Sequence, residues 1–156
     1  MLGMLTEGFL VSLQIFFFTI AGAVPLGVVV ALGRMSRVAP LRWIVRIYIS
    51  IMRGTPLMLQ MFAIYFAPYY LFGIQLTPDS KWQATIAAFI VNYAAYFAEI
   101  YRSGLQSIPH GQYEAAEVLG YSRGQTFCYI VLPQVVKRIL PAMGNEIITL
   151  VKDTSL

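Results

Sequence analysis

Long apolar runs separated by short polar segments set the pattern of this chain. Residues 8–32 form the longest run and contain no charged side chain. A helix needs about 20 apolar residues to cross the hydrocarbon core of a bilayer, and this run is long enough. Three further apolar runs follow at 56–72, 82–101 and 141–156. We therefore predict an all-α, polytopic helical membrane protein in which these four runs are spans of a single transmembrane domain.

Residues 107–133 interrupt this apolar pattern. Within them Glu114, Ala115 and Ala116 open a short helical stretch that Gly120 is expected to end, because a residue without Cβ can adopt positive φ at a helix C-terminus. The segment is too polar to cross a bilayer and too apolar for a free loop. We predict that it inserts into a groove on a partner protein.

Composition supports lipid as the solvent, because 58% of the residues are hydrophobic and only 12% are charged. Soluble domains typically carry about 25% charged residues. Lys81 is the one basic residue in the link between the second and third runs, so the positive-inside rule places that link outside the cell. The same rule places 107–133 in the cytoplasm and the amino terminus outside. The net charge of +4 gives little support to nucleic-acid binding.

Two carboxylates in the fourth run are candidates for a substrate pathway. Glu146 and Asp153 are seven residues apart, so both lie on one face of a helix. Charge at membrane depth requires a partner or water, and such a face suits the α-ammonium group or a cationic side chain of an amino acid. The competing interpretation is neutralisation, of Asp153 by Lys152 and of Glu146 by Arg138.

Lone amides in the apolar runs are weaker candidates for the same pathway. Gln60 and Asn92 could contact a substrate, although a packing hydrogen bond between helices is the favoured interpretation for Gln60. Glu99 and Arg102 are three residues apart at the end of the third run, and we predict an internal ion pair between them.

The parts of a catalytic centre are missing from the sequence. No stretch fits G-x-x-x-x-G-K-[ST], so the chain is not expected to bind or hydrolyse ATP. Cys128 and His110 are the only cysteine and histidine, and neither has the neighbours of a nucleophile or a metal site. We predict no enzyme activity, no metal and no cofactor.

A family resemblance rests on several of these segments together. The spacing of EAA at 114–116, Gly120, Ile130 and the Leu132-Pro133 pair is similar to the signature loop of ATP-binding-cassette importer permeases. The stretches RGTP at 53–56, AEIYR at 98–102, GQ at 111–112, NE at 145–146 and KD at 152–153 resemble the branch of that family that imports polar amino acids.

This resemblance implies a permease subunit in the inner or plasma membrane of a bacterium. Its implied partners are cytoplasmic ATPase subunits docked on 114–124, a second permease half that is identical or homologous, an external amino acid-binding protein and the surrounding lipid. ATP-driven closure of the ATPases would tilt the spans between outward and inward access. Two alternatives remain open, an ion-coupled secondary transporter and a non-transporting membrane scaffold.

The end of the chain departs from the pattern of the family it resembles. Such permeases continue past the KD stretch at 152–153 through one more span. The run from 141 to 156 corresponds to about 24 Å of helix, which is shorter than the roughly 30 Å hydrocarbon core. We expect either a truncated chain or a pathway that another subunit completes.

Overall fold

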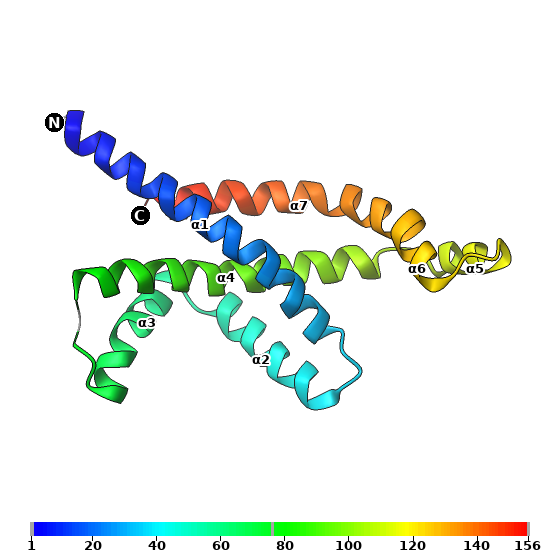
Figure 1. Ribbon diagram of the computed structural model, residues 1–156, viewed down its shortest axis with the longest axis horizontal. Helices are drawn as coiled ribbons and strands as arrows, with labels where there is room; N and C mark the ends of the chain where they lie inside the picture. Colours follow the sequence, from blue (N-terminus) through cyan, green and yellow to red (C-terminus); the bar gives the residue numbers. More distant parts are fainter. Residues whose placement is uncertain (1, 76, 156) are drawn as a thin grey trace.

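In a computed structural model of the protein, residues 2–75 and 77–155 are described, and all of their regular structure is helical (Figure 1). The prediction of an all-α fold is confirmed for this part of the chain. The elements are α1 (Leu2–Arg34), α2 (Ala39–Gly54), α3 (Leu57–Phe72), α4 (Pro78–Gln106), α5 (His110–Val118), α6 (Arg123–Gln125), the π-helical segment η1 (Thr126–Val131) and α7 (Leu132–Asp153).

Helices α1 and α4 pack against each other and are each long and apolar enough to cross a membrane, over Thr6–Arg34 and Asp79–Gln106. Their close approach depends on small residues. A Cβ on Gly27 would lie 2.9 Å from Phe97 Cβ and 3.3 Å from the Ala94 carbonyl oxygen. Small residues at such contacts let helix backbones pack tightly where the surrounding solvent is lipid.

Helices α2 and α3 are the two arms of a broken helix, bent by 115° at Thr55 and Pro56. Proline has no N–H to donate into a helix interior, so the chain restarts at Leu57 with Pro56 as the N-cap. If the two arms together form one span, the described residues contain three candidate spans. The count of four spans stays a prediction.

Helix α4 is the centre of the fold, because α1, α2, α3 and α7 all contact it. Figure 1 shows α1 crossing α4 obliquely while α7 runs alongside it. The main hydrophobic cluster follows one face of α4 through Phe89, Tyr93 and Phe97, and includes Ile15 of α1 and Leu150 of α7. The spacing of four residues along α4 gives this continuous stripe.

The last helix begins earlier than the predicted fourth span. Its residues continue directly from α6 and η1, so the chain is helical from Arg123 to Asp153, with Pro141 inside α7. The predicted end of the span at Leu156 lies outside the described residues. The limits 141–156, like those of the other spans and of the docking loop at 107–133, stay predictions.

Candidate functional site

A cavity of about 410 Å³ lies where the start of α3 meets α4 and α7. It brings together three of the four predicted pathway residues, Asn92 of α4 with Glu146 and Asp153 of α7. The fourth, Gln60, is buried next to the cavity and is not part of its lining. The prediction that the two carboxylates share a face is confirmed by this lining. Their role as a substrate pathway stays a prediction.

Asp153 is held by a tyrosine and not by a basic side chain. The Tyr93 hydroxyl donates to Asp153 Oδ2 at 2.5 Å, and the Tyr93 side chain is 2% exposed. Among the described residues, no lysine or arginine lies within salt-bridge distance of Asp153 or Glu146. Arg138, the alternative partner of Glu146, instead donates to the Ser107 carbonyl oxygen. The competing interpretation named Lys152 and Arg138 as partners, and neither of them forms a salt bridge with these carboxylates.

The start of α3 and a nearby arginine bring positive charge to the region of the cavity. Helix α3 starts at Leu57, which lines the cavity with Thr55 and Pro56, and a helix N-terminus presents unpaired N–H groups and a positive dipole end. The Arg53 guanidinium lies 5.2 Å from the centre of the Tyr96 ring, which also lines the cavity. The cavity thus combines two carboxylates with a helix N-terminus, and Arg53 lies beside Tyr96 in the adjoining hollow.

A second hollow of about 210 Å³ continues along α4 toward the predicted docking loop, residues 107–133, here called the docking segment. It shares Tyr96 and Glu146 with the first cavity and adds Arg53, Glu99 and Ser103. Both hollows therefore lie along the cleft between α4 and α7.

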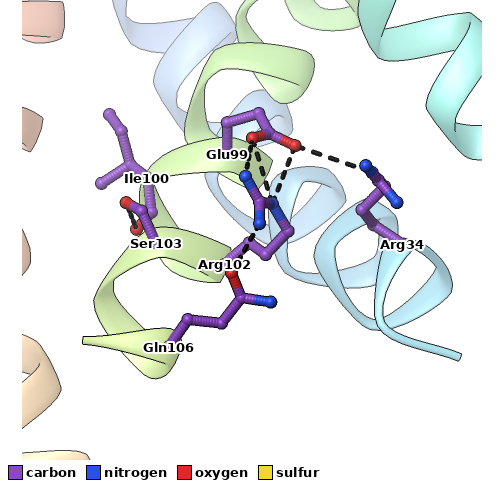
Figure 2. A network of polar contacts seen from close by, with 6 residues as sticks. All are labelled: Arg34, Glu99, Ile100, Arg102, Ser103 and Gln106. Carbon is purple, nitrogen blue, oxygen red and sulfur yellow. Dashed lines mark hydrogen bonds and ion pairs between the residues drawn. The ribbon is translucent and has the colours of Figure 1, made fainter. Parts of the chain in front are cut away.

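An ion-pair cluster stands at the end of this second hollow (Figure 2). Arg102 donates to both oxygens of Glu99, with the shortest contact at 2.6 Å, and Arg34 of α1 lies 3.8 Å from Glu99. The Arg102 guanidinium also donates to Gln106 at 2.6 Å. The predicted Glu99–Arg102 ion pair is confirmed, and Arg34 ties it to a second helix.

The two intramembrane amides form one network at the helix break. The Asn92 amide donates to Gln60 Oε1 at 2.8 Å and to the Met52 carbonyl oxygen at 3.0 Å. The Gln60 amide donates to the Met52 and Thr55 carbonyl oxygens, both at 3.0 Å, and to the Thr55 hydroxyl at 2.8 Å. These bonds satisfy backbone carbonyls that the broken helix leaves unpaired. The packing role favoured for Gln60 is confirmed, and Asn92 shares it.

The docking segment folds as a short helix closed by a left-handed glycine. Gly120 has φ of +77°, and the amides of Gly120 and Tyr121 donate back to the Glu117 and Ala116 carbonyl oxygens. This is the hydrogen-bond pattern of a Schellman cap, so the predicted role of Gly120 is confirmed. Ala116 is buried, and the neighbouring Val118 is 88% exposed.

The outer face of this segment combines exposed polar and apolar side chains. Glu114 and Ala115 are exposed, and Glu114 lies 3.1 Å from His110 Nδ1. Next to them is a hollow of about 540 Å³, lined by His110, Tyr113, Glu117, Tyr121, Arg123, Thr126 and Phe127. Exposed apolar residues beside an open hollow are typical of a protein interaction surface.

Sequence reasoning missed Tyr93, Tyr96 and Arg53. Tyr96 follows Asn92 by four residues and precedes Glu99 by three, a spacing that places all three side chains on one face of α4. That periodicity could have identified Tyr96. The contacts of Tyr93 with Asp153 and of Arg53 with Tyr96 join distant segments and leave no local signal.

Comparison with known proteins identifies relatives of this chain. A family described as "Binding-protein-dependent transport system inner membrane component" matches residues 23–156. An arginine transport system permease protein of Bacillus subtilis is 40% identical over 96% of this chain and 67% of its own length. An L-cystine transport system permease protein of the same organism is 35% identical over 84% of this chain, which spans only 54% of that relative.

A solved structure agrees with these relatives. The crystal structure of an amino acid ABC transporter with histidines matches with a TM-score of 0.84 and 36% identity, over 96% of this chain and 68% of that one. The predicted resemblance to ATP-binding-cassette importer permeases is confirmed. The chain therefore belongs to the family of binding-protein-dependent transport system inner membrane components.

Proposed function

We propose that this chain is the membrane permease subunit of an ATP-driven importer of polar amino acids. The observation that carries the proposal is the pair of carboxylates, Glu146 and Asp153, in a cavity where no lysine or arginine of the described residues forms a salt bridge with them. The family of the chain and the amino acid permeases related to it support the same conclusion.

The cavity has the charges that a zwitterionic amino acid requires. A substrate α-ammonium would pair with Asp153 or Glu146, and its α-carboxylate would face the N-terminus of α3 and Arg53. Tyr93 fixes the Asp153 carboxylate by donating to Oδ2, which leaves the other oxygen free to accept from the substrate. Both ends of the substrate would then be recognised inside the helical bundle.

Coupling to ATP hydrolysis would enter through the docking segment. Cytoplasmic ATPase subunits would bind the exposed face that carries Glu114, Ala115 and the Gly120 turn, while Ala116 is buried beneath it. The chain is helical from Arg123 to Asp153. A displacement at the docking face would therefore move this helical run and, with it, the carboxylates of the cavity. Such coupling is reciprocal, so substrate in the cavity also biases the ATPases.

The proposed assembly follows from this arrangement and from the family. A second permease half, identical or homologous, completes the pathway, and an external amino acid-binding protein delivers the substrate. The chain resides in the inner or plasma membrane of a bacterium, with the amino terminus outside and 107–133 in the cytoplasm, as its basic residues predict. ATP is bound by the partner subunits, and this chain needs no cofactor.

Uptake by the reconstituted complex tests the cavity. Asp153→Asn removes the charge but keeps the shape, and should raise the KM for the amino acid by about 10-fold to 100-fold, the equivalent of the roughly 1.5–3 kcal/mol of a charged hydrogen bond. Lys152→Gln is the matched control, because Lys152 is the exposed neighbour of Asp153 and outside the cavity lining. Wild-type KM in Asp153→Asn, with Lys152→Gln also unchanged, would refute the site.

Two glycine variants test the docking segment. A Cβ at Gly120 or at Gly124 meets no atom within 4 Å, but only Gly120 has positive φ. Gly120→Ala should therefore strain the turn by about 1–2 kcal/mol and uncouple ATP hydrolysis from uptake, while Gly124→Ala stays coupled. Equal coupling in both variants would contradict the proposal.

Uptake without any ATPase subunit would indicate an ion-coupled carrier, and absence of uptake in the intact wild-type complex would indicate a scaffold.

A further inference from the structure

A groove of about 260 Å³ lies between the ends of α1 and α4 and the start of α7. Its lining includes Val28, Leu32, Tyr101, Phe127, Leu132 and Val136. The only hydroxyl in the lining is that of Tyr101, and it already donates to the Val24 carbonyl oxygen at 3.4 Å. A polar ligand would lose its hydrogen bonds to water here without replacement, so the occupant that fits is a hydrocarbon chain.

The groove opens on the outside of the helical bundle. Its lining residues Leu32, Val28 and Val136 are 61%, 46% and 43% exposed. Helix α1, which contributes Val28 and Leu32, is one of the two helices long and apolar enough to cross a membrane. Lipid therefore has lateral access to the groove.

Two arginines follow or precede lining residues of this groove by a few positions in the sequence, Arg37 after Met35 and Arg123 before Phe127. Arg37 lies in the turn directly after α1, and Arg123 begins the helical run that leads to Phe127. Both are exposed, and neither forms a salt bridge within the described part of the chain. Basic side chains at the end of a membrane helix attract anionic lipid headgroups, with about 1 kcal/mol for each.

We propose that this groove binds an acyl chain of an anionic phospholipid whose headgroup lies near Arg37 and Arg123. Phe127 connects the groove with the docking segment, because it lines both the groove and the hollow of that segment. It belongs to the π-helical segment η1, and a π turn inserted in an α-helical run rotates the side chains that precede it. Lipid in the groove would hold η1 in this geometry.

Photolabelling of the intact complex in lipid nanodiscs tests the proposal. The probe is a phosphatidylglycerol with a photoreactive acyl chain, compared with the matching phosphatidylcholine probe, and labelled peptides are mapped by mass spectrometry. Val28→Trp fills the groove, and Val29→Trp is its control, because Val29 is 64% exposed and outside the lining. Arg37→Gln combined with Arg123→Gln removes the charges, with Arg42→Gln, an exposed arginine of α2, as control.

We expect the phosphatidylglycerol probe to label peptides that contain Leu32 and Leu132 more than the phosphatidylcholine probe does. Val28→Trp should abolish this labelling and Val29→Trp should leave it. The double arginine variant should lower the preference for phosphatidylglycerol by about 25-fold, about fivefold for each charge, and Arg42→Gln should leave it unchanged. Equal labelling by both probes, labelling that survives Val28→Trp, or a groove protected by another polypeptide such as a second copy would each overturn the proposal.

Discussion

Replacement of Asn92 by leucine tests whether the amide network holds the broken helix against α4. Asn92 is 4% exposed and Gln60 is 7% exposed, so both amides are removed from solvent. Asn92 donates two hydrogen bonds, to Gln60 Oε1 at 2.8 Å and to the Met52 carbonyl oxygen at 3.0 Å. The apolar replacement deletes both bonds and leaves Gln60 Oε1 without its donor.

The expected loss of stability follows from these contacts. Two interhelical hydrogen bonds in a membrane protein contribute about 0.6 kcal/mol each. The buried acceptor left on Gln60 costs about 1–3 kcal/mol more. Asn92→Leu should therefore lower the free energy of unfolding by about 2–4 kcal/mol. Gln60→Leu in the same chain removes that acceptor, so the double variant should lose about 1–3 kcal/mol less than the sum of the two single variants.

Unfolding of the purified chain in mixed micelles measures this cycle, and amino acid uptake by the complex is measured in parallel. Gln83→Leu is the control on α4, because Gln83 is exposed and surface substitutions change stability by about 0.5 kcal/mol or less. Additive single and double variants would refute the reasoning. Wild-type stability together with a raised KM in Asn92→Leu would instead make Asn92 a substrate contact.

Two further predictions concern α1 and the ion-pair cluster. Gly27→Ala should destabilise the chain by about 1–3 kcal/mol in the same unfolding assay, because its Cβ would meet Phe97 Cβ and the α4 backbone. Gly8→Ala in the same helix is the control. Its Cβ meets no atom within 4 Å, so this variant should be neutral or stabilising. Arg102→Leu should lower the free energy of unfolding by about 1.5–3 kcal/mol. Among the described residues, Arg34 at 3.8 Å is then the one salt-bridge partner left to Glu99. Arg102→Lys should restore part of this loss.

Local signals in the sequence identified the helical fold and several of its ends. Gly120 was placed at positive φ from the short helix that precedes it, and the Glu99–Arg102 pair from a spacing of one turn. Both features depend on residues within four positions of each other, where helix geometry alone decides which groups meet. The shared face of Glu146 and Asp153 follows in the same way.

Contacts between distant segments could not be predicted in this way. The Gln60–Asn92 bond joins residues 32 apart, and the Tyr93–Asp153 bond joins residues 60 apart. Helix α7 also begins before the predicted fourth span, for a physical reason. Pro141 has the appearance of a helix start, but inside a bundle neighbouring groups can satisfy the carbonyl that a proline leaves free, so the helix continues through it.

The packing of the other helices against α4 determines which part of the proposed transporter can move. Helices α1, α2, α3 and α7 all contact α4, and Gly27 and the Asn92 network fix two of these contacts tightly. The helical run from Arg123 to Asp153 also packs closely on α4, where a Cβ on Gly104 would meet Ile139 Cγ2, and it presents the cavity carboxylates near its far end. In the proposed mechanism, a displacement of α5 changes the contact between α4 and α7 at the far end of this run, where the Tyr93 hydroxyl donates to Asp153. In the proposed mechanism, breaking that bond would release the carboxylate that we propose as the partner of the substrate ammonium, and this single hydrogen bond would then couple docking to transport.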